Sequence, residues 1–345
     1  MTRIFLRGVG AVSPAGWGVA PLLEALRAGT PLPLQELPAP SGRRFPVRLV
    51  PPPATRPAWL AHPRLRRASS ISHFAVAAAV EALQPWPGVA PGAVRLGIVT
   101  GTHAASMRYS ERFFGEVLQN PATASPMLFP ETVINAPASH VAAFLGCTGL
   151  CYSLIADQTA FVQALLVGCD WLAEQRVDAC LVLGMDEVSW PIAEALSHHS
   201  RRIALSEGAG AVLLAREPGA GPMVELERVT DAQLFAGAST KLPAAQAMRR
   251  QLPGERAGDT LLDSRSGATR LDRAEELAWS DWRGTRLSPR LVLGEALSAA
   301  TAWQFVAAHA ALSEGTSAAA NVSVVGGNLQ AIGARLTRRP ATEQL

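Results

Sequence analysis

Short apolar runs alternate with segments of helical periodicity along most of the chain. Strands bounded by glycine, proline or polar residues are predicted over 3–13, 95–100, 151–156, 178–184 and 207–214. Apolar residues spaced by three and four predict helices over 19–27, 69–83 and from Thr159 onward, and the segment 104–145 is mostly helical in pattern. Strands alternating with buried helices are typical of an α/β protein.

The second part of the chain restarts this alternation. Strands are predicted over 224–229, 260–263, 291–293, 321–325 and 330–336, and a helix over 297–312. The last two strands are expected to form a hairpin around Gly326-Gly327-Asn328. We therefore expect two similar βαβ halves packed on each other, 1–220 and 221–345. Residues 31–66, rich in proline and arginine, are expected to form an irregular surface excursion.

One strand and the helix after it stand at the centre of the pattern. The strand 151–156 stops at Asp157-Gln158, and the helix begins near Thr159 with Asp157 or Thr159 as its expected cap. In α/β enzymes such a turn often presents a nucleophile at a helix N-terminus, where the dipole and free N–H groups stabilise negative charge. Gln158, which occupies the apex here, is no nucleophile.

Composition limits the class of protein. The 345 residues, 48% hydrophobic and 17% charged, can bury a large core. The formal net charge of +3 is too small to predict a nucleic-acid partner, and the arginine pairs are interpreted as solvated surface. The apolar start is interrupted by Arg7, and no apolar run is long enough to span a membrane. We expect a cytoplasmic protein without membrane or nucleic-acid partners.

Cysteine and histidine positions predict neither a metal nor a cofactor. The four cysteines form no Cys-x-x-Cys pair, so neither a zinc site nor a disulfide framework is expected. Cys151 is the strongest alternative nucleophile, but inside a strand it is interpreted as an inert core thiol. His198-His199 is interpreted as solvent-facing, and the histidines His103, His140 and His309 as structural.

Several segments, taken in order, resemble β-ketoacyl-acyl carrier protein synthases of the thiolase fold. They are the opening strand Gly8 to Pro14, Asn135 before the nucleophile strand, Gly149 to Gln158, Glu207-Gly208-Ala209-Gly210, Ser288 to Glu295, and Asn321 to Asn328. The resemblance covers nearly the whole chain and implies a layered αβαβα arrangement.

The positions that carry catalysis in that family hold other residues here. In the family, a cysteine takes the acyl chain as a thioester, and two histidines assist decarboxylation and stabilise negative charge. The matching positions hold Gln158, Ser264 and Glu295, and the neighbouring lysine position holds Arg290. An amide cannot form the thioester, and a carboxylate would repel an oxyanion. Arg290 and Glu295 are expected to neutralise each other as a pair.

The resemblance therefore narrows to the chain-length factors, catalytically silent members that form heterodimers with an active ketosynthase in type II polyketide and aryl-polyene-type systems. It implies an active ketosynthase as partner and an acyl carrier protein as an indirect one. Candidates for the tunnel or the interface are Met107, Phe113, Phe114, Met127, Phe129, Asn135 and Phe161. Ordinary core packing is the alternative for segment 104–145. The alternative function is a stand-alone thiolase-fold enzyme, either a malonyl-carrier-protein decarboxylase or an acyltransferase with an unorthodox nucleophile such as Cys151.

Overall fold

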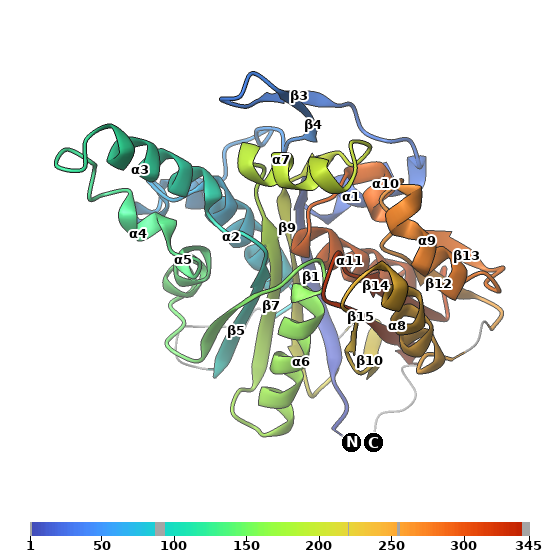
Figure 1. Ribbon diagram of the computed structural model, residues 1–345. Coiled ribbons are helices and arrows are strands. Elements are labelled where there is room, and N and C mark those ends of the chain that lie inside the picture. Colours follow the sequence, from blue (N-terminus) through green and yellow to red (C-terminus); the bar gives the residue numbers. More distant parts are fainter. Residues whose placement is uncertain (1, 87–93, 220, 254–255, 340–345) are drawn as a thin grey trace.

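The computed structural model describes residues 2–86, 94–219, 221–253 and 256–339, and it contains two strand sets of the same design (Figure 1). The first set has the order β1-β9-β7-β5-β6 and the second β10-β15-β14-β12-β13. In both sets the first two pairings are antiparallel and the last two are parallel. The fold therefore repeats one strand arrangement, as the sequence pattern predicts.

The strand bounds follow the apolar runs closely. The first set comprises β1 (Phe5–Ser13), β5 (Leu96–Thr102), β6 (Cys151–Ile155), β7 (Ala179–Asp186) and β9 (Gly208–Ala215). The second comprises β10 (Met223–Val229), β12 (Asp259–Leu262), β13 (Thr285–Leu287), β14 (Ala319–Val325) and β15 (Gln330–Arg339). Two short strands, β2 (Gly16–Trp17) and β11 (Gln233–Leu234), pair with β1 and β15. The two sets meet where β1 and β10 pair at Phe5–Glu225 and Leu6–Val224.

Helices cover and separate the two strand sets. Helices α6 (Ala160–Ala173) and α11 (Ser298–Ser313) pack against strands of both sets, and most of their residues are buried. Helix α2 (Ser70–Leu83) covers the outer face of the first set, and α8 (Ala238–Arg250) and α9 (Thr269–Ala278) lie outside the second. This is the expected layered αβαβα arrangement.

The approach of α2 to its sheet depends on two glycines. A Cβ atom at Gly8 or Gly10 of β1 would overlap with the carbonyl oxygens of Ala82 and Ala78 on α2. Glycine therefore allows the helix backbone to lie directly on the strand. The alanine-rich sequence of α2 serves the same close packing, since a methyl side chain adds little bulk.

The remaining elements lie around this frame. The other helices are α1 (Val19–Ala28), α3 (Met107–Gln119), α4 (Phe129–Thr132), α5 (Ala136–Leu145), α7 (Trp190–His199) and α10 (Pro289–Leu293). A small separate sheet contains β3 (Gln35–Pro38), β4 (Arg44–Arg48) and β8 (Leu205–Ser206), and two 3-10 turns cover Ala58–Ala61 and Pro63–Leu65. No helix within the described residues is both long and apolar enough to cross a membrane.

Two sequence predictions of local structure are wrong. Residues 291–293 are not a strand: they belong to the short helix α10, and the strand of that unit is β13. Pro289 at the first helical position has the φ that a helix needs, and a short apolar run cannot distinguish a strand from a buried helix. The excursion 31–66 is not wholly irregular, because β3 and β4 form an antiparallel hairpin in it. The division of the chain at 220/221 into two halves stays a prediction.

Candidate functional site

The turn between β6 and α6 places Gln158 at the junction of the two halves. Its side-chain oxygen accepts a hydrogen bond from the Gly327 N–H over 2.8 Å, and its Nε2 lies 3.5 Å from Glu295 Oε2. Its backbone carbonyl accepts a hydrogen bond from the Thr301 hydroxyl over 2.6 Å. Both ends of the amide are therefore engaged, and the residue acts as a bridge between neighbouring segments.

Asp157 stabilises the same turn, but not as a simple helix cap. Its Oδ1 accepts hydrogen bonds from the N–H and the hydroxyl of Thr159, at 3.0 and 2.7 Å. Its Oδ2 lies 3.3 Å from the N–H groups of Asn328 and Leu329 in the β14–β15 hairpin. The carboxylate thus holds the hairpin against the turn, which the expectation of a capping role missed.

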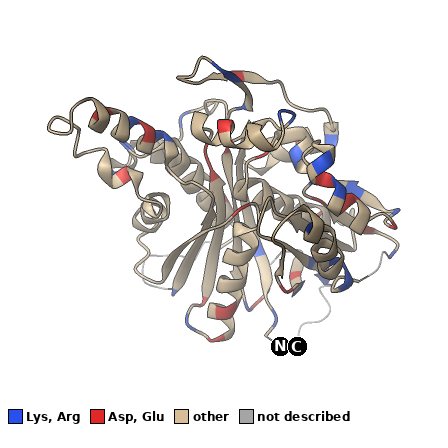
Figure 2. Cartoon of the chain, in the orientation of Figure 1, with Lys and Arg blue, Asp and Glu red and all other residues tan. Residues whose placement is uncertain are grey.

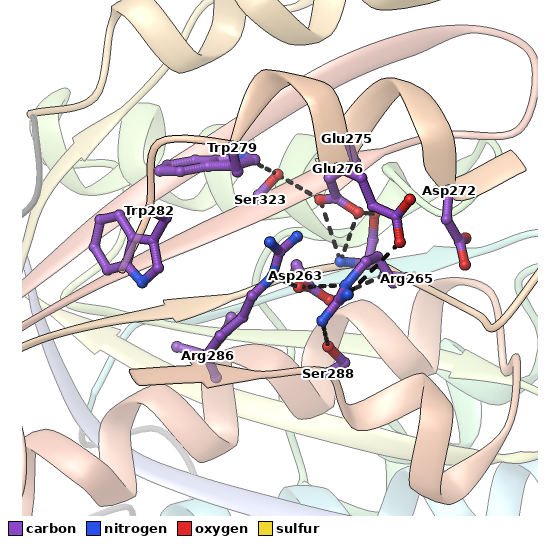
Figure 3. Close-up of polar contacts among 12 residues, drawn as sticks. Asp263, Arg265, Asp272, Glu275, Glu276, Trp279, Trp282, Arg286, Ser288 and Ser323 are labelled. Atoms are coloured by element: carbon purple, nitrogen blue, oxygen red, sulfur yellow. Dashed lines mark hydrogen bonds and ion pairs between the residues drawn. The ribbon is translucent and has the colours of Figure 1, made fainter. Parts of the chain in front are cut away.

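Ser264 lies in a buried polar network that follows β12. Its N–H and hydroxyl donate to the Glu275 carboxylate of α9, the hydroxyl over 2.7 Å, and its Oγ accepts from the Val325 N–H over 3.0 Å. The same carboxylate accepts from the Ser323 hydroxyl, which in turn accepts from the Trp279 indole N–H (Figure 3). Burial, and secondarily the nearby Asp263 carboxylate, raise the pKa of Glu275 to about 7.

Next to this network, Asp263 balances two arginines. Its carboxylate is fully buried and pairs with Arg265 over 2.9 Å and with Arg286 (Figure 3). The Arg265 guanidinium also donates to the Ser288 hydroxyl over 3.0 Å. The loop that contains Ser264 is therefore held by ion pairs and hydrogen bonds. The match of Ser264 to the first histidine of ketosynthases stays a prediction.

Arg290 and Glu295 form the expected buried pair. Their side chains are 2% and 3% exposed, and Arg290 Nε lies 3.6 Å from Glu295 Oε1. Glu295 Oε1 also accepts from the Leu297 N–H over 2.7 Å. The Arg290 guanidinium donates to the Ser264 carbonyl over 2.8 Å and to the Thr301 hydroxyl over 2.9 Å. Burial raises the pKa of Glu295, and the Arg290 charge opposes that shift.

A backbone turn brings Glu295 to this place. Gly294, which follows α10, has φ 94°, a conformation that a residue with a side chain rarely adopts. The backbone of Glu295 then exchanges hydrogen bonds with Ala204 and Ser206, the N–H donating over 2.9 Å and the carbonyl accepting over 2.8 Å. The Glu295 side chain is consequently fixed in the space between the two strand sets.

These four side chains meet in one small cavity. Gln158, Ser264, Arg290 and Glu295 line a space of about 40 Å³, enough for a few water molecules. A second cavity of about 210 Å³ shares Gln158, Ile203, Leu271 and Gly327 with it and is also lined by His103 and His199. The smaller cavity is lined by carboxylates, a guanidinium, an ammonium and an amide, and none of its lining residues is a cysteine or histidine.

Several other residues singled out from the sequence lie elsewhere. Cys151 is exposed on β6, so the prediction that it is a core residue is wrong. Its thiol is nevertheless partly shielded, and this loss of hydration raises its pKa. His140 Nε2 lies 2.7 Å from Glu131 Oε1. His309 lies on α11, where desolvation lowers its pKa to about 4. Within the described residues, no three or more histidine, cysteine, aspartate or glutamate side chains are grouped in a way that could hold a metal ion.

An apolar surface lies on α3 and the segment that follows it, far along the chain from the cavity residues. Phe114, Leu118, Met127 and Phe129 are 57%, 86%, 62% and 56% exposed. Phe113 is half-buried beneath them, with its ring centroid 5.7 Å from that of Phe114 and 5.6 Å from that of Phe129. The alternative prediction that Phe114, Met127 and Phe129 pack in the core is therefore wrong. Met107 is half-buried at the start of α3.

The last two tunnel or interface candidates, Asn135 and Phe161, lie outside this apolar surface and differ from each other in burial. Asn135 is exposed just before α5. Phe161 is fully buried on α6, with its ring 5.1 Å from that of Phe305 on α11. Phe161 therefore fills the space between the two central helices.

Charged residues lie mostly on the outer helices and loops, and the central strands carry few (Figure 2).

Sequence reasoning missed Glu275 and Lys241 as residues of the site. Glu275 is not among the residues singled out from the sequence, although its carboxylate accepts the hydrogen bond of the Ser264 hydroxyl. Lys241 of α8 lines the cavity of about 40 Å³. Lys241 could have been singled out from the sequence, because it is the only lysine among 31 lysine and arginine residues.

Comparison with known proteins gives structural matches only. No family model matches the chain, and no curated protein matches it. Its fold is similar to that of the ishigamide ketosynthase/chain length factor, with a TM-score of 0.80 and 20% identity over 98% of this chain and 100% of that one. A chain in the structure of the ketosynthase ApeO in complex with its chain length factor ApeC from Xenorhabdus doucetiae matches with a TM-score of 0.79, at 16% identity over 98% of each chain.

A β-ketoacyl synthase from Burkholderia phymatum matches as well, with a TM-score of 0.78 and 16% identity over 99% of this chain and 100% of that one. The chain therefore has the thiolase-like fold of ketosynthases and chain length factors over nearly its whole length. At such identities the likeness concerns the fold, and function must be argued from the site.

Proposed function

We propose that this chain is a non-catalytic ketosynthase-like subunit, a chain-length factor, which forms a heterodimer with an active β-ketoacyl synthase and shapes the tunnel for the growing chain. The observation that carries the proposal is the presence of Gln158, in place of a nucleophile, at the turn between β6 and α6. Gln158 stands at the apex where the fold would present a nucleophile, and its amide bonds to Gly327 and approaches Glu295.

The chemistry of the cavity supports this proposal. Acyl transfer needs a nucleophile and donors aimed at the developing oxyanion. Here the Glu295 carboxylate faces the Gln158 amide, and the Ser264 hydroxyl already donates to Glu275. The Arg290 charge is balanced by Glu295 at 3.6 Å. The side chains of Gln158, Ser264, Arg290 and Glu295 are held by contacts with protein groups, which suits a structural role better than acyl transfer.

Two surfaces support association with a partner. Strand β6 pairs only with β5 among the described strands, so its other edge offers free backbone groups, and Tyr152 and Ile155 on it are 49% and 57% exposed. The apolar surface of Phe114, Leu118, Met127 and Phe129 adds bulky groups of the kind enriched at interfaces. We infer that the active ketosynthase covers these surfaces and that segment 104–145 also lines the far end of the tunnel. An acyl carrier protein would bind to the ketosynthase and interact with this chain only indirectly.

The second candidate function is a stand-alone acyltransferase or malonyl-carrier-protein decarboxylase. The observation in its favour is the exposure of Cys151, which leaves a thiol within reach of a substrate. Its raised pKa keeps little of it as the reactive thiolate. No partner residue of the described chain forms a hydrogen bond to that thiol, so the chain-length-factor role is the better account.

One experiment separates the two functions. The chain is purified alone and together with the ketosynthase encoded beside it, and each sample is incubated with acyl- and malonyl-carrier protein. We expect a stable one-to-one complex, product formation only in the complex, and a hydroxylamine-labile acyl group only on the ketosynthase. Decarboxylation by the chain alone, or a labile acyl group on it that is lost in Cys151→Ser, would overturn the proposal.

A further inference from the structure

Lys241 occupies an unusual place for the only lysine of the chain. All other members of the 31 lysine and arginine residues are arginines. Lys241 lies in the first turn of α8 and lines the same cavity of about 40 Å³ as Gln158, Arg290 and Glu295. A guanidinium stays protonated in proteins, whereas an ammonium can lose its proton and become a nucleophile. The only side-chain amine of the sequence is therefore placed in the cavity beside Gln158.

The Lys241 ammonium has no charged partner. Within the described residues it forms neither an ion pair nor a hydrogen bond, and its Nζ lies 5.6 Å from the centroid of the Phe235 ring. Burial lowers its pKa, and the carboxylates of Glu275, Asp157 and Asp272 oppose this shift from a distance. The positive end of the helix dipole also disfavours a cation in the first turn of α8. A larger share of free amine follows than for an exposed lysine.

The cavity beside Lys241 borders two larger spaces, the outer of which lies at the surface. Lys241 is only half-buried. Its cavity shares Gln158, Ile203, Leu271 and Gly327 with the space of about 210 Å³. That space shares Leu196 and Ile203 with a surface groove of about 540 Å³ beside α7 and β4. The size of the inner cavity favours a short acyl group, and a longer one would extend past Gln158 into the next space.

We propose that the ε-amine of Lys241 accepts acyl groups from small acyl thioesters that enter the vacated pocket. The nitrogen attacks the thioester carbonyl carbon, a C–N bond forms and the C–S bond breaks. The released thiolate takes the proton that the nitrogen loses, so the products are an amide and a thiol. The amide is stable, and the step is a modification of the chain with no turnover. Acylation removes the Lys241 charge and places an acyl group beside Gln158.

The test uses an internal reference in the same helix. Arg250 is exposed at the end of α8, and Arg250→Lys supplies a second amine in an ordinary environment. The full-length variant is treated with the acetyl thioester of N-acetylcysteamine, and acetylation at 241 and 250 is followed by peptide mapping over time. We expect acetylation of Lys241 to be several-fold faster than that of the lysine at 250, and to tolerate hydroxylamine.

A pH series and a substitution complete the test. The rate at 241 should reach its plateau at a lower pH than the rate at 250, and Lys241→Arg should abolish acetylation at 241. Equal or slower acetylation of Lys241 than of the lysine at 250 would overturn the proposal. Because the readout is a hydroxylamine-resistant amide on the chain alone, its outcome is independent of whether the chain binds a ketosynthase.

Discussion

The amide oxygen of Gln158 accepts a hydrogen bond from the backbone N–H of Gly327 over 2.8 Å. This contact joins the β6–α6 turn of the first strand set to the β14–β15 hairpin of the second. The amide nitrogen meanwhile faces the Glu295 carboxylate at 3.5 Å. A neutral side chain that accepts at one end and donates at the other suits both neighbours.

Replacing Gln158 by glutamate keeps the acceptor but adds a charge beside Glu295. We expect Gln158→Glu to be destabilised more at pH 8 than at pH 5, because each carboxylate opposes the ionisation of the other and a larger share of both is ionised at the higher pH. Gln158→Met, the uncharged control, loses the bond to Gly327 and about 1 kcal/mol at either pH. Urea unfolding at the two pH values measures both. A pH-independent loss in Gln158→Glu would contradict the placement of the two side chains.

The Arg290–Glu295 pair predicts a strong coupling. Arg290→Met leaves the Glu295 carboxylate buried without its cation, and a loss of about 3–5 kcal/mol is expected. The double variant Arg290→Met with Glu295→Gln removes both charges and should recover much of that loss. The free energies of unfolding of the two single variants and the double variant measure the coupling. Additive losses would show that the two side chains do not interact.

The raised pKa of Glu275 predicts how stability changes with pH. With a pKa of about 7 in the folded chain and an ordinary value near 4.3 in the unfolded chain, the folded state binds more protons between these limits. Stability therefore falls as pH rises from about 4.5 to 7, by about 2–3 kcal/mol from this residue. Glu275→Gln should reduce that fall. Parallel pH profiles of the variant and the parent chain would disprove the assignment.

The hairpin loop offers a matched pair of substitutions. A Cβ atom at Gly326 would overlap with Asp157 Oδ2, whereas at Gly327 the nearest atom, Gln158 Oε1, would be 3.3 Å away. We expect Gly326→Ala to lower the melting temperature clearly, with a cost of about 2 kcal/mol or more. Gly327→Ala should cost less. Equal costs would mean that the Asp157 carboxylate can move aside.

The fold was largely predictable from the sequence, because β5, β7 and β9 are apolar runs with no competing pattern. The site was predictable in its members but not in its contacts. The order of motifs predicted that Gln158, Ser264 and Glu295 lie together, yet the acceptor of the Ser264 hydroxyl came from α9, whose Glu275 looks like any helical carboxylate in sequence. Likewise Cys151 has the apolar neighbours of a core strand, and only the sheet order reveals that β6 is an edge.

The proposed interface predicts that its substitutions affect the complex but hardly affect the chain alone. Phe114→Ala and Met127→Ala remove exposed side chains, so the stability of the isolated chain should change by no more than about 0.5 kcal/mol. In the reconstituted pair, alanine at Phe113, Phe114 or Met127 should weaken association and lengthen the products. Copurification and product mass spectra measure the two effects. Unchanged product length in all three variants would remove segment 104–145 from the tunnel.

The free edge of β6 has a consequence for how the cell must make this protein. An edge with exposed Tyr152 and Ile155 is a template for pairing with another strand. Under the proposed function, a copy that does not meet its ketosynthase is therefore expected to pair with another copy or to aggregate. We expect the yield of soluble chain to depend on simultaneous synthesis of the partner, so that the ratio in which the two subunits are produced limits the amount of working complex.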